Sequence, residues 1–255
     1  MKNLLYLTLL ISLPSFSAEF KSWKELQARL EKAGGNIKMM KHMKCFMEKG
    51  SDRSFEFKKP SSSSYENRCY KKSQYDIGNK KTFALIDYTK PSGDNRFFIV
   101  DRETGVVTKM AVAHGRYKSG YMRRFTKNKH NSVRKSKYFS NQRGSNAPAS
   151  GFYLAGQQYF GKWDKSLILN GLEKDVNDNA CERAVVIHGH KMVSQNKVYT
   201  MSSGCPMITK KNVDQVVGAL KGSGNISSGL EKSGSVVFIY GPREKKWAND
   251  YCGEI

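Results

Sequence analysis

An imidazole and a thiol stand seventeen positions apart in the second half of the sequence. The chain reads His188-Gly189 at the end of an apolar run, and Ser202-Ser203-Gly204-Cys205-Pro206 after a polar interval. A cysteine thiol is mostly protonated at neutral pH, and a neighbouring histidine can take its proton and later return it to a departing amine. The pattern therefore predicts that Cys205 is a nucleophile and that His188 is its general base.

The two elements that must hold these groups differ in kind. Residues 184–188 are rich in β-branched side chains and predict a buried strand that ends at the histidine, whereas residues 202–206 predict a turn. Glycine before the thiol permits a left-handed turn, so we expect the backbone N–H groups of Gly204 and Cys205 to bind the oxyanion of the reaction. The structural alternative is that the histidine and the cysteine only pack.

The rest of the second half predicts short strands and one helix. A turn over residues 102–105 joins two of the strands as a hairpin. Strands are expected at residues 82–88, 96–101, 106–114, 151–157, 166–169, 184–188 and 236–240. One helical face is shared by Val213, Val216, Val217 and Leu220. We therefore expect a mainly β catalytic domain at residues 81–241 with one or two helices, followed by a tail at residues 242–255.

The N-terminal part of the chain has a different character. Residues 1–18 combine one lysine, an apolar run and small residues before the end, which is typical of a cleavable secretion signal; a retained anchor is the alternative. In residues 19–80, Ser22 and Glu25 form a capping box for a first helix, and residues 38–49 predict a second. No later segment reaches the roughly 20 apolar residues of a membrane-spanning helix. We expect an exported protein with a small helical N-terminal region of unknown role.

Export changes how the five cysteines are interpreted. An oxidising compartment favours pairing, an odd number leaves one thiol over, and Cys205 is the best candidate for the free one. Four cysteines allow three connectivities, of which we expect the pairs Cys45–Cys69 and Cys181–Cys252. No metal is expected, because the sequence has no CxxC pair, its histidines are not clustered at zinc-finger spacing, and His188 and His190 have no nearby carboxylate or second thiol. No cofactor is expected either.

The chain is strongly basic, with a formal net charge of +22. Twelve basic and no acidic residues lie between Thr104 and Trp163, most of them at residues 116–143, where the absence of apolar periodicity predicts a long basic loop. Such a loop suits an anionic partner, and for an exported protein an acidic cell-wall polymer is more natural than nucleic acid. The alternative is an ordinary solvated face.

Several of these segments resemble a known family. His188-Gly189 followed by Ser-Ser-Gly-Cys is similar to the His-Gly and Ser-His-Gly-Cys signature of the L,D-transpeptidase catalytic domain, which has the YkuD-like fold. Within it, the Gly-Cys-Pro loop resembles a murein L,D-transpeptidase branch. Further similar segments lie at residues 113–116, 139–141, 144–145, 151–153 and 178–180. The resemblance covers roughly residues 83–240. It departs from the wider family at Ser203, where histidine is usual, and at Met207, where arginine is frequent.

The resemblance implies a β-sandwich-like catalytic domain and an enzyme of the bacterial cell wall, placed in the periplasm or cell-wall space. By this resemblance, Cys205 attacks the carbonyl between the L-centre of diaminopimelate and the terminal D-Ala of a peptidoglycan stem tetrapeptide, and D-Ala leaves an acyl-enzyme. An amine of a neighbouring stem then gives a 3→3 cross-link. Water gives L,D-carboxypeptidation instead, and a free D-amino acid gives exchange.

The same resemblance implies roles for residues around the reacting pair. The backbone carbonyl of Gly189 is expected to orient His188. His114 is expected to line the substrate pocket, and it is the rival general base because it too follows an apolar strand and precedes glycine. Contacts to the stem peptide are expected from Tyr153, Ser140 and Asn141. For His114 structural packing is the alternative, and for these three residues and Ser203 it is ordinary packing or turn formation.

A function of another class fits the same composition. A secreted basic protein could hold an anionic wall polymer or nucleic acid through residues 116–143, with Cys205 merely buried or paired. Only the enzyme would form a covalent adduct with a carbapenem, which separates the two hypotheses. Neither the acceptor of the acyl group nor the oligomeric state follows from the sequence.

Overall fold

The computed structural model of the protein describes residues 19–50, 54–58, 69, 74–117, 129–224 and 232–241. Several sequence predictions lie outside these residues: the secretion signal at 1–18, residues 118–128 of the basic loop, and the tail at 242–255 with Cys252. No helix in the described ranges is both long enough and apolar enough to cross a membrane.

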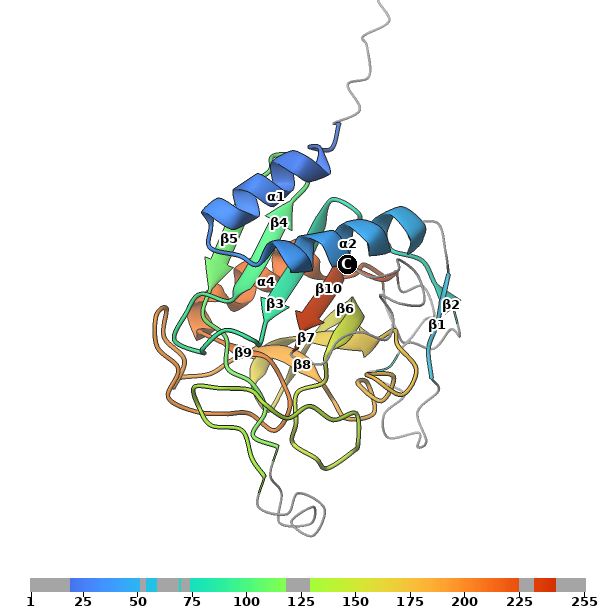
Figure 1. The fold of residues 1–255 in the computed structure, drawn as a ribbon. Coiled ribbons are helices and arrows are strands. Elements are labelled where there is room, and N and C mark those ends of the chain that lie inside the picture. Colours follow the sequence, from blue (N-terminus) through green and yellow to red (C-terminus); the bar gives the residue numbers. More distant parts are fainter. Residues whose placement is uncertain are drawn as a thin grey trace, which may run out of the picture.

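Eight strands form one sheet, and two short strands form a second (Figure 1). In spatial order the large sheet contains β5 (Val107–Met110), β4 (Phe97–Asp101), β3 (Thr82–Asp87), β10 (Val236–Tyr240), β6 (Gly151–Gly161), β7 (Asp164–Gly171), β8 (Val186–Gly189) and β9 (Met207–Ile208). The small sheet pairs β1 (Phe55–Glu56) with β2 (Gln74–Tyr75). Strand pairs β3–β10 and β8–β9 are parallel, and the other neighbours are antiparallel.

The large sheet curls until its two edges nearly meet. Beyond the end of β5, Ala113 forms an antiparallel bridge with Met207 of β9. The Ala113 N–H lies 2.8 Å from the Met207 carbonyl oxygen, and the Met207 N–H lies 3.2 Å from the Ala113 carbonyl oxygen. Because β5 and β9 are the two edge strands, this bridge gives the sheet a nearly closed, barrel-like shape.

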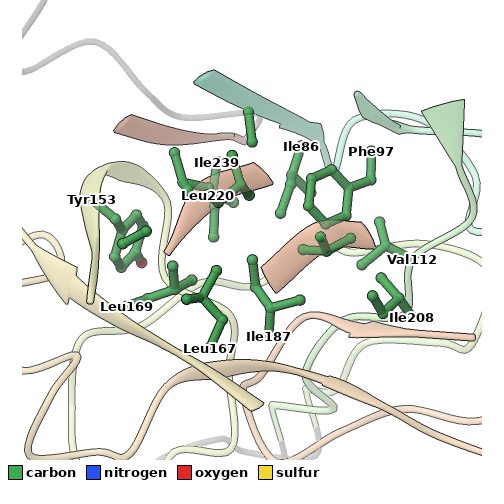
Figure 2. Packing of buried hydrophobic residues seen from close by; sticks show 14 of the residues in the cluster. Ile86, Phe97, Val112, Tyr153, Leu167, Leu169, Ile187, Ile208, Leu220 and Ile239 are labelled. Atoms are coloured by element: carbon green, nitrogen blue, oxygen red, sulfur yellow. The ribbon is translucent and has the colours of Figure 1, made fainter. Parts of the chain in front are cut away.

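The interior of the curled sheet is the main hydrophobic core. Side chains alternate along a strand, so Ala84 and Ile86 of β3 face inward while Phe83 and Leu85 face outward. Figure 2 shows inward residues from most of the strands converging on this interior. Helix α4 (Val213–Leu220) contributes to it the four residues that share its apolar face. This helix is the one that the sequence predicted.

Two N-terminal helices cover the outer face of the sheet (Figure 1). Helix α1 (Trp23–Lys32) begins at Ser22, whose side chain accepts a hydrogen bond from the Glu25 N–H, and α2 (Ile37–Gly50) follows a short turn. Leu26 and Leu30 of α1 pack in one cluster with Phe83 and Leu85 of β3. The predicted mainly β fold with a small helical N-terminal region is confirmed, and the helices share a core with the sheet.

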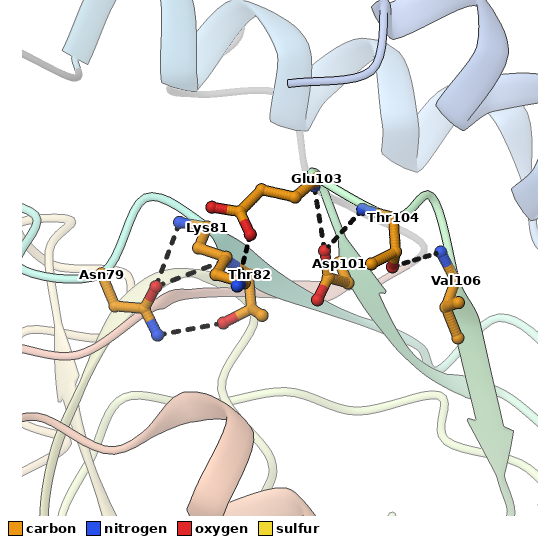
Figure 3. A network of polar contacts seen from close by, with 7 residues as sticks. All are labelled: Asn79, Lys81, Thr82, Asp101, Glu103, Thr104 and Val106. Atoms are coloured by element: carbon orange, nitrogen blue, oxygen red, sulfur yellow. Dashed lines mark hydrogen bonds and ion pairs between the residues drawn. The ribbon is translucent and has the colours of Figure 1, made fainter. Parts of the chain in front are cut away.

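The predicted turn between two strands is present and is fixed by polar contacts (Figure 3). The Asp101 carboxylate accepts hydrogen bonds from the N–H groups of Glu103 and Thr104, each at 2.9 Å, and Gly105 has a φ of +73°. The Glu103 carboxylate also forms an ion pair with Lys81 at the start of β3. These contacts hold β3, β4 and β5 in register, as the hairpin prediction required.

The predicted disulfide pairing is wrong. Cys69 is bonded to Cys181, with the two Cα atoms 5.5 Å apart and 112 positions of sequence between them. Cys45 is disulfide-bonded as well, and Cys205 is free. The prediction paired the two cysteines of the N-terminal region with each other, and the two that flank the expected catalytic core with each other. The folded chain instead brings Cys69 of the N-terminal region against the segment that follows β7.

Candidate active site

A serine and a glycine determine the conformation of the loop that carries Cys205. The Ser202 hydroxyl accepts a hydrogen bond from the Gly204 N–H at 3.0 Å and donates one to the Cys205 carbonyl at 2.6 Å. Gly204 has a φ of +126°, and a Cβ there would lie 2.9 Å from the Ala147 carbonyl oxygen. Only glycine fits this conformation and this close approach. The loop therefore places a partly buried thiol directly after a tight turn.

The backbone donors of this loop differ in their availability. The Gly204 N–H, which we expected to bind an oxyanion, is already engaged by the Ser202 hydroxyl. The Cys205 N–H has no hydrogen-bond acceptor among the residues that the structure describes. Of the two expected donors, the Cys205 N–H is therefore the one free to meet a developing negative charge.

The Cys205 thiol is neutral in this conformation. Its Sγ atom donates to the Ala184 carbonyl oxygen at 3.4 Å. Burial raises the pKa of the thiol, and a hydrogen bond to the Val186 backbone and the positive charge of Arg183 act against that rise. Ala184 has a φ of +55°, a left-handed conformation that costs an alanine about 1–2 kcal/mol. Strained residues of this kind are often found at functional sites.

His188 lies near the end of a strand that pairs with the strand after the nucleophile loop. It lies in β8, opposite Met207 of the parallel strand β9, and its backbone N–H donates to the Pro206 carbonyl at 3.3 Å. Cys205 precedes β9 by two residues, so the thiol lies in the loop that leads into the strand beside β8. No hydrogen bond joins the thiol to the imidazole in the described part of the chain. Transfer of the proton therefore requires the thiol to turn away from Ala184.

The His188 ring is oriented by the carbonyl that follows it. Its Nδ1 atom lies 3.1 Å from the Gly189 carbonyl oxygen, which only accepts, so Nδ1 carries the hydrogen and Nε2 keeps a lone pair. Trp163 stacks on the ring at a centroid distance of 5.0 Å. Desolvation by burial is the main cause that lowers the pKa of His188 to about 4. The imidazole is therefore neutral at pH 7 and can accept a proton at Nε2.

His114, the rival base, is differently placed. It is fully buried, and its Nδ1 atom lies 2.7 Å from the guanidinium of Arg96. Arginine only donates, so Nδ1 is the acceptor, and Nε2 carries the hydrogen that it donates to the Ser132 carbonyl at 3.0 Å. Burial and the Arg96 charge lower the pKa of His114 to about 3. These contacts leave neither ring nitrogen free to take a proton from Cys205.

The three residues expected to contact a stem peptide make internal contacts. Tyr153 is fully buried, and its hydroxyl donates to the Ala149 carbonyl at 2.7 Å. Ser140 accepts a hydrogen bond from a backbone N–H in its own turn, at 3.1 Å. Asn141 donates to the Asp178 carboxylate at 2.5 Å and so links the loop before β6 to the segment after β7. Each therefore has an internal contact of the kind that the structural alternative expects, and contact with a stem peptide stays a prediction.

Two arginines that sequence reasoning passed over contact the nucleophile loop. Arg116 donates to the Ser202 carbonyl and the Ser203 hydroxyl, each at 3.3 Å. Arg183 approaches from the other segment, and its guanidinium would lie 3.2 Å from a Cβ at Gly204. Both arginines looked like ordinary members of a basic chain. Their only sequence signal was position, one after His114-Gly115 and the other just before β8.

A large cavity lies away from these residues. It has a volume of about 690 Å³ and is lined by aromatic and charged residues of α2, β1, β6 and the segment after β7, among them Phe46, Phe55 and Phe152. None of the candidate site residues lines it. The cavity and the candidate active site are therefore separate features of the molecule.

Comparison with known proteins finds one matching family. Residues 56–227 match the model of the L,D-transpeptidase catalytic domain. No curated protein matches the chain. Among solved structures, the helical cell shape determining protein Pgp2 from Campylobacter jejuni is similar at 11% identity and a TM-score of 0.35, over 63% of this chain and 48% of that one. A point mutant of the same protein is similar at 11% identity and a TM-score of 0.35, over 68% of this chain and 50% of that one.

The chain spans about half the length of these solved structures. So weak a likeness carries no weight for function, and the family match stands without it. That match covers more than half of the sequence and includes both His188 and Cys205. The chain belongs to the L,D-transpeptidase catalytic domain family.

Proposed function

We propose that this protein is an exported cysteine acyltransferase that acts on peptidoglycan stem tetrapeptides. One observation carries the proposal. A free thiol, Cys205, lies in the loop before β9, the strand that pairs with the one carrying His188. The His188 imidazole is neutral and keeps a lone pair on Nε2. Both residues lie within the match to the L,D-transpeptidase catalytic domain family. The expected products are 3→3 cross-links.

The first half of the reaction forms a thioester. The thiol turns from Ala184 toward His188, whose Nε2 takes the proton as Sγ attacks the carbonyl between diaminopimelate and D-Ala. The Cys205 N–H stabilises the oxyanion that forms, and such a donor contributes about 3–4 kcal/mol to transition-state stabilisation. Collapse of the intermediate breaks the peptide C–N bond. His188 returns its proton to the leaving nitrogen, and D-Ala departs.

The second half consumes the acyl-enzyme. His188 Nε2 takes a proton from the acceptor, the acceptor attacks the thioester carbonyl, and the C–S bond breaks as the thiol recovers its proton. A side-chain amine of a neighbouring stem gives the 3→3 cross-link. Water at the same position gives an L,D-carboxypeptidase, and a free D-amino acid gives exchange, so these alternatives differ only in the acceptor.

The two pKa shifts favour proton transfer from a neutral pair. Burial raises the pKa of Cys205 and lowers the pKa of His188 to about 4, so thiol and imidazole are both uncharged before substrate binds. The thiolate forms only as Nε2 removes the proton during attack. A sulfur that stays protonated at rest is also less exposed to oxidation, which suits an oxidising compartment.

Export is part of the same proposal. The Cys69–Cys181 disulfide supports it, because structural disulfides are typical of oxidising compartments such as the periplasm. The secretion signal predicted at residues 1–18 points to the same place. Peptidoglycan is the expected partner there, and the basic residues of the loop at 116–143 suit an anionic wall polymer.

A covalent label tests the proposal. Purified protein is incubated with a carbapenem and its mass is measured, with Cys205→Ala as the matched control. The enzyme hypothesis expects a mass increase of one opened carbapenem in the wild type and none in the variant. A wild type that stays unlabelled, and that leaves tetrapeptide muropeptides unchanged, would favour a protein that only binds an anionic polymer.

A further inference from the structure

The Arg183 guanidinium is partly buried beside the nucleophile loop. Its two terminal nitrogens donate to the carbonyls of Ser140 at 2.7 Å and Ala147 at 2.6 Å. Both acceptors are neutral, and no carboxylate pairs with Arg183 within the described ranges. The site therefore contains a positive charge, largely removed from water, that lacks an anion. Such a charge is unfavourable unless something compensates it.

Two contacts bring Arg183 and Cys205 close together. The guanidinium contacts Gly204, the residue before Cys205, closely enough to be 3.2 Å from a Cβ placed there. The thiol donates to the carbonyl of Ala184, the residue after Arg183. The positive charge of Arg183 accordingly opposes the rise in the pKa of Cys205 that burial causes.

The segment that carries Arg183 is anchored at both ends. The Arg183 N–H donates to the Asn179 carbonyl, and the Ala184 N–H donates to the Cys181 carbonyl, each at 2.9 Å. Cys181 is itself bonded to Cys69. The disulfide and the turn hold the backbone of this segment, and the hydrogen bonds to the Ser140 and Ala147 carbonyls hold the guanidinium beside the nucleophile loop.

Other cations near the site are neutralised, exposed or engaged elsewhere. Arg143 is exposed and forms an ion pair with Glu182 at 3.7 Å. Arg116 is exposed, so water screens its charge. Arg96 is fully buried, where it donates to His114 and to the Val112 carbonyl. Arg183 alone among these four is both partly buried and in contact with the nucleophile loop.

We infer that Arg183 is a positioning residue that compensates the Cys205 thiolate and fixes the loop beside it. The inference deepens the proposed function, since the thiolate is the species that attacks the stem peptide. Arg183 acts through Cys205 and through the two carbonyls that it holds. When Nε2 of His188 takes the thiol proton, the new negative charge on sulfur meets a cation that is already in place, so little reorganisation is needed.

Alkylation kinetics test the inference without any substrate. The rate of modification of Cys205 by iodoacetamide, a neutral reagent, is followed by peptide mass spectrometry across a pH series. Wild type is compared with Arg183→Gln, with Arg183→Lys, and with Arg143→Gln as a control that removes a neighbouring charge already paired with Glu182. Circular dichroism establishes that each variant is folded.

The expected result is a shift in the pH profile. Removing an opposite charge close to the thiol moves the inflection of Arg183→Gln upward by about one pH unit. Because a thiol of higher pKa is also a better nucleophile once ionised, alkylation at pH 7 slows by about three- to tenfold. Above both inflections, Arg183→Gln reacts at least as fast as wild type. Arg183→Lys recovers part of the shift, and Arg143→Gln shows none.

Two outcomes would overturn the inference. A profile for Arg183→Gln with the wild-type inflection, or a rate reduced by one constant factor at every pH, would make Arg183 a purely structural residue. An equal shift in Arg143→Gln would assign the effect to overall charge. Because alkylation needs no stem peptide, a protein that shows the shift but forms no carbapenem adduct would refute the proposed function and leave this inference standing.

Discussion

Two histidine-glycine pairs in this chain look alike in sequence and have opposite environments in the fold. His188-Gly189 and His114-Gly115 each follow an apolar stretch and each end at glycine. Both imidazoles are buried, and burial lowers the pKa of both. At His114 a guanidinium and a backbone carbonyl occupy the two ring nitrogens. At His188 a carbonyl occupies Nδ1 alone, and Nε2 keeps its lone pair.

Burial alone therefore does not distinguish the two histidines. The hydrogen-bond partners of the ring nitrogens do. Arg96 reaches His114 from the start of β4, and Ser132 reaches it from the loop after residue 128. A group that can only donate removes the one lone pair that a neutral imidazole has, so the ring can no longer act as a base. Trp163 covers the face of the His188 ring, and no residue that the structure describes donates a hydrogen bond to its Nε2 atom.

The largest expected effect separates the two histidines by activity. His188→Ala should lower turnover of tetrapeptide muropeptides by about 10²–10⁴-fold, the usual contribution of a general base. His114→Ala should retain most of the activity of whatever fraction is folded. Product formation is measured by mass spectrometry and normalised to folded protein. Equal loss in both variants would remove the distinction, and loss in His114→Ala alone would make His114 the base.

The second effect separates them by stability. His114→Ala leaves a buried Arg96 donor without its acceptor, which should lower the free energy of unfolding at pH 7 by about 1–3 kcal/mol. Because the folded pKa of His114 is about 3, only the unfolded state binds its proton between pH 6.5 and 3, and wild-type stability falls as the pH is lowered through this window. That loss is about 2 kcal/mol between pH 7 and pH 5.

The variant lacks this proton, so its deficit relative to wild type should shrink by the same amount at pH 5. Urea unfolding at the two pH values measures both quantities. His42, whose pKa burial lowers to about 4, and His188 contribute equally in wild type and variant and cancel in the comparison. A deficit that stays constant with pH would mean that His114 binds its proton as readily in the folded state as in the unfolded state.

The smallest effect concerns the ring that covers His188. Trp163→Ala should expose the imidazole and raise the pKa of His188 by about one unit from its value near 4, because desolvation is the main cause of that value. The acid limb of the pH–rate profile then moves upward. Activity at pH 5 should fall about twofold relative to pH 7, through a smaller neutral fraction. Phe160→Ala, which removes another exposed aromatic ring of the same hairpin, should leave the limb in place.

Much of the local structure followed from sequence pattern. The runs at residues 82–88, 96–101 and 236–240 contain enough β-branched and aromatic residues to be recognised, and each became a strand within one or two residues of the prediction. The two N-terminal helices and α4 were visible from capping and from periodicity. Strand ends were less predictable. The run at 106–114 became the shorter β5, and β6 extended to Gly161, because pairing with neighbours sets where a strand stops.

Within the site, residue type determined the chemistry, and the fold determined its geometry. The sequence alone identified a thiol and an imidazole of types able to exchange a proton, and a glycine able to make the turn directly before the thiol. The sequence could not predict that Cys69 pairs with Cys181, that both ring nitrogens of His114 are engaged, or that Arg183 lies against Gly204. Each of these contacts joins segments that are distant along the chain. Local pattern reports the preferences of neighbouring residues, and only the closed sheet decides which distant side chains meet.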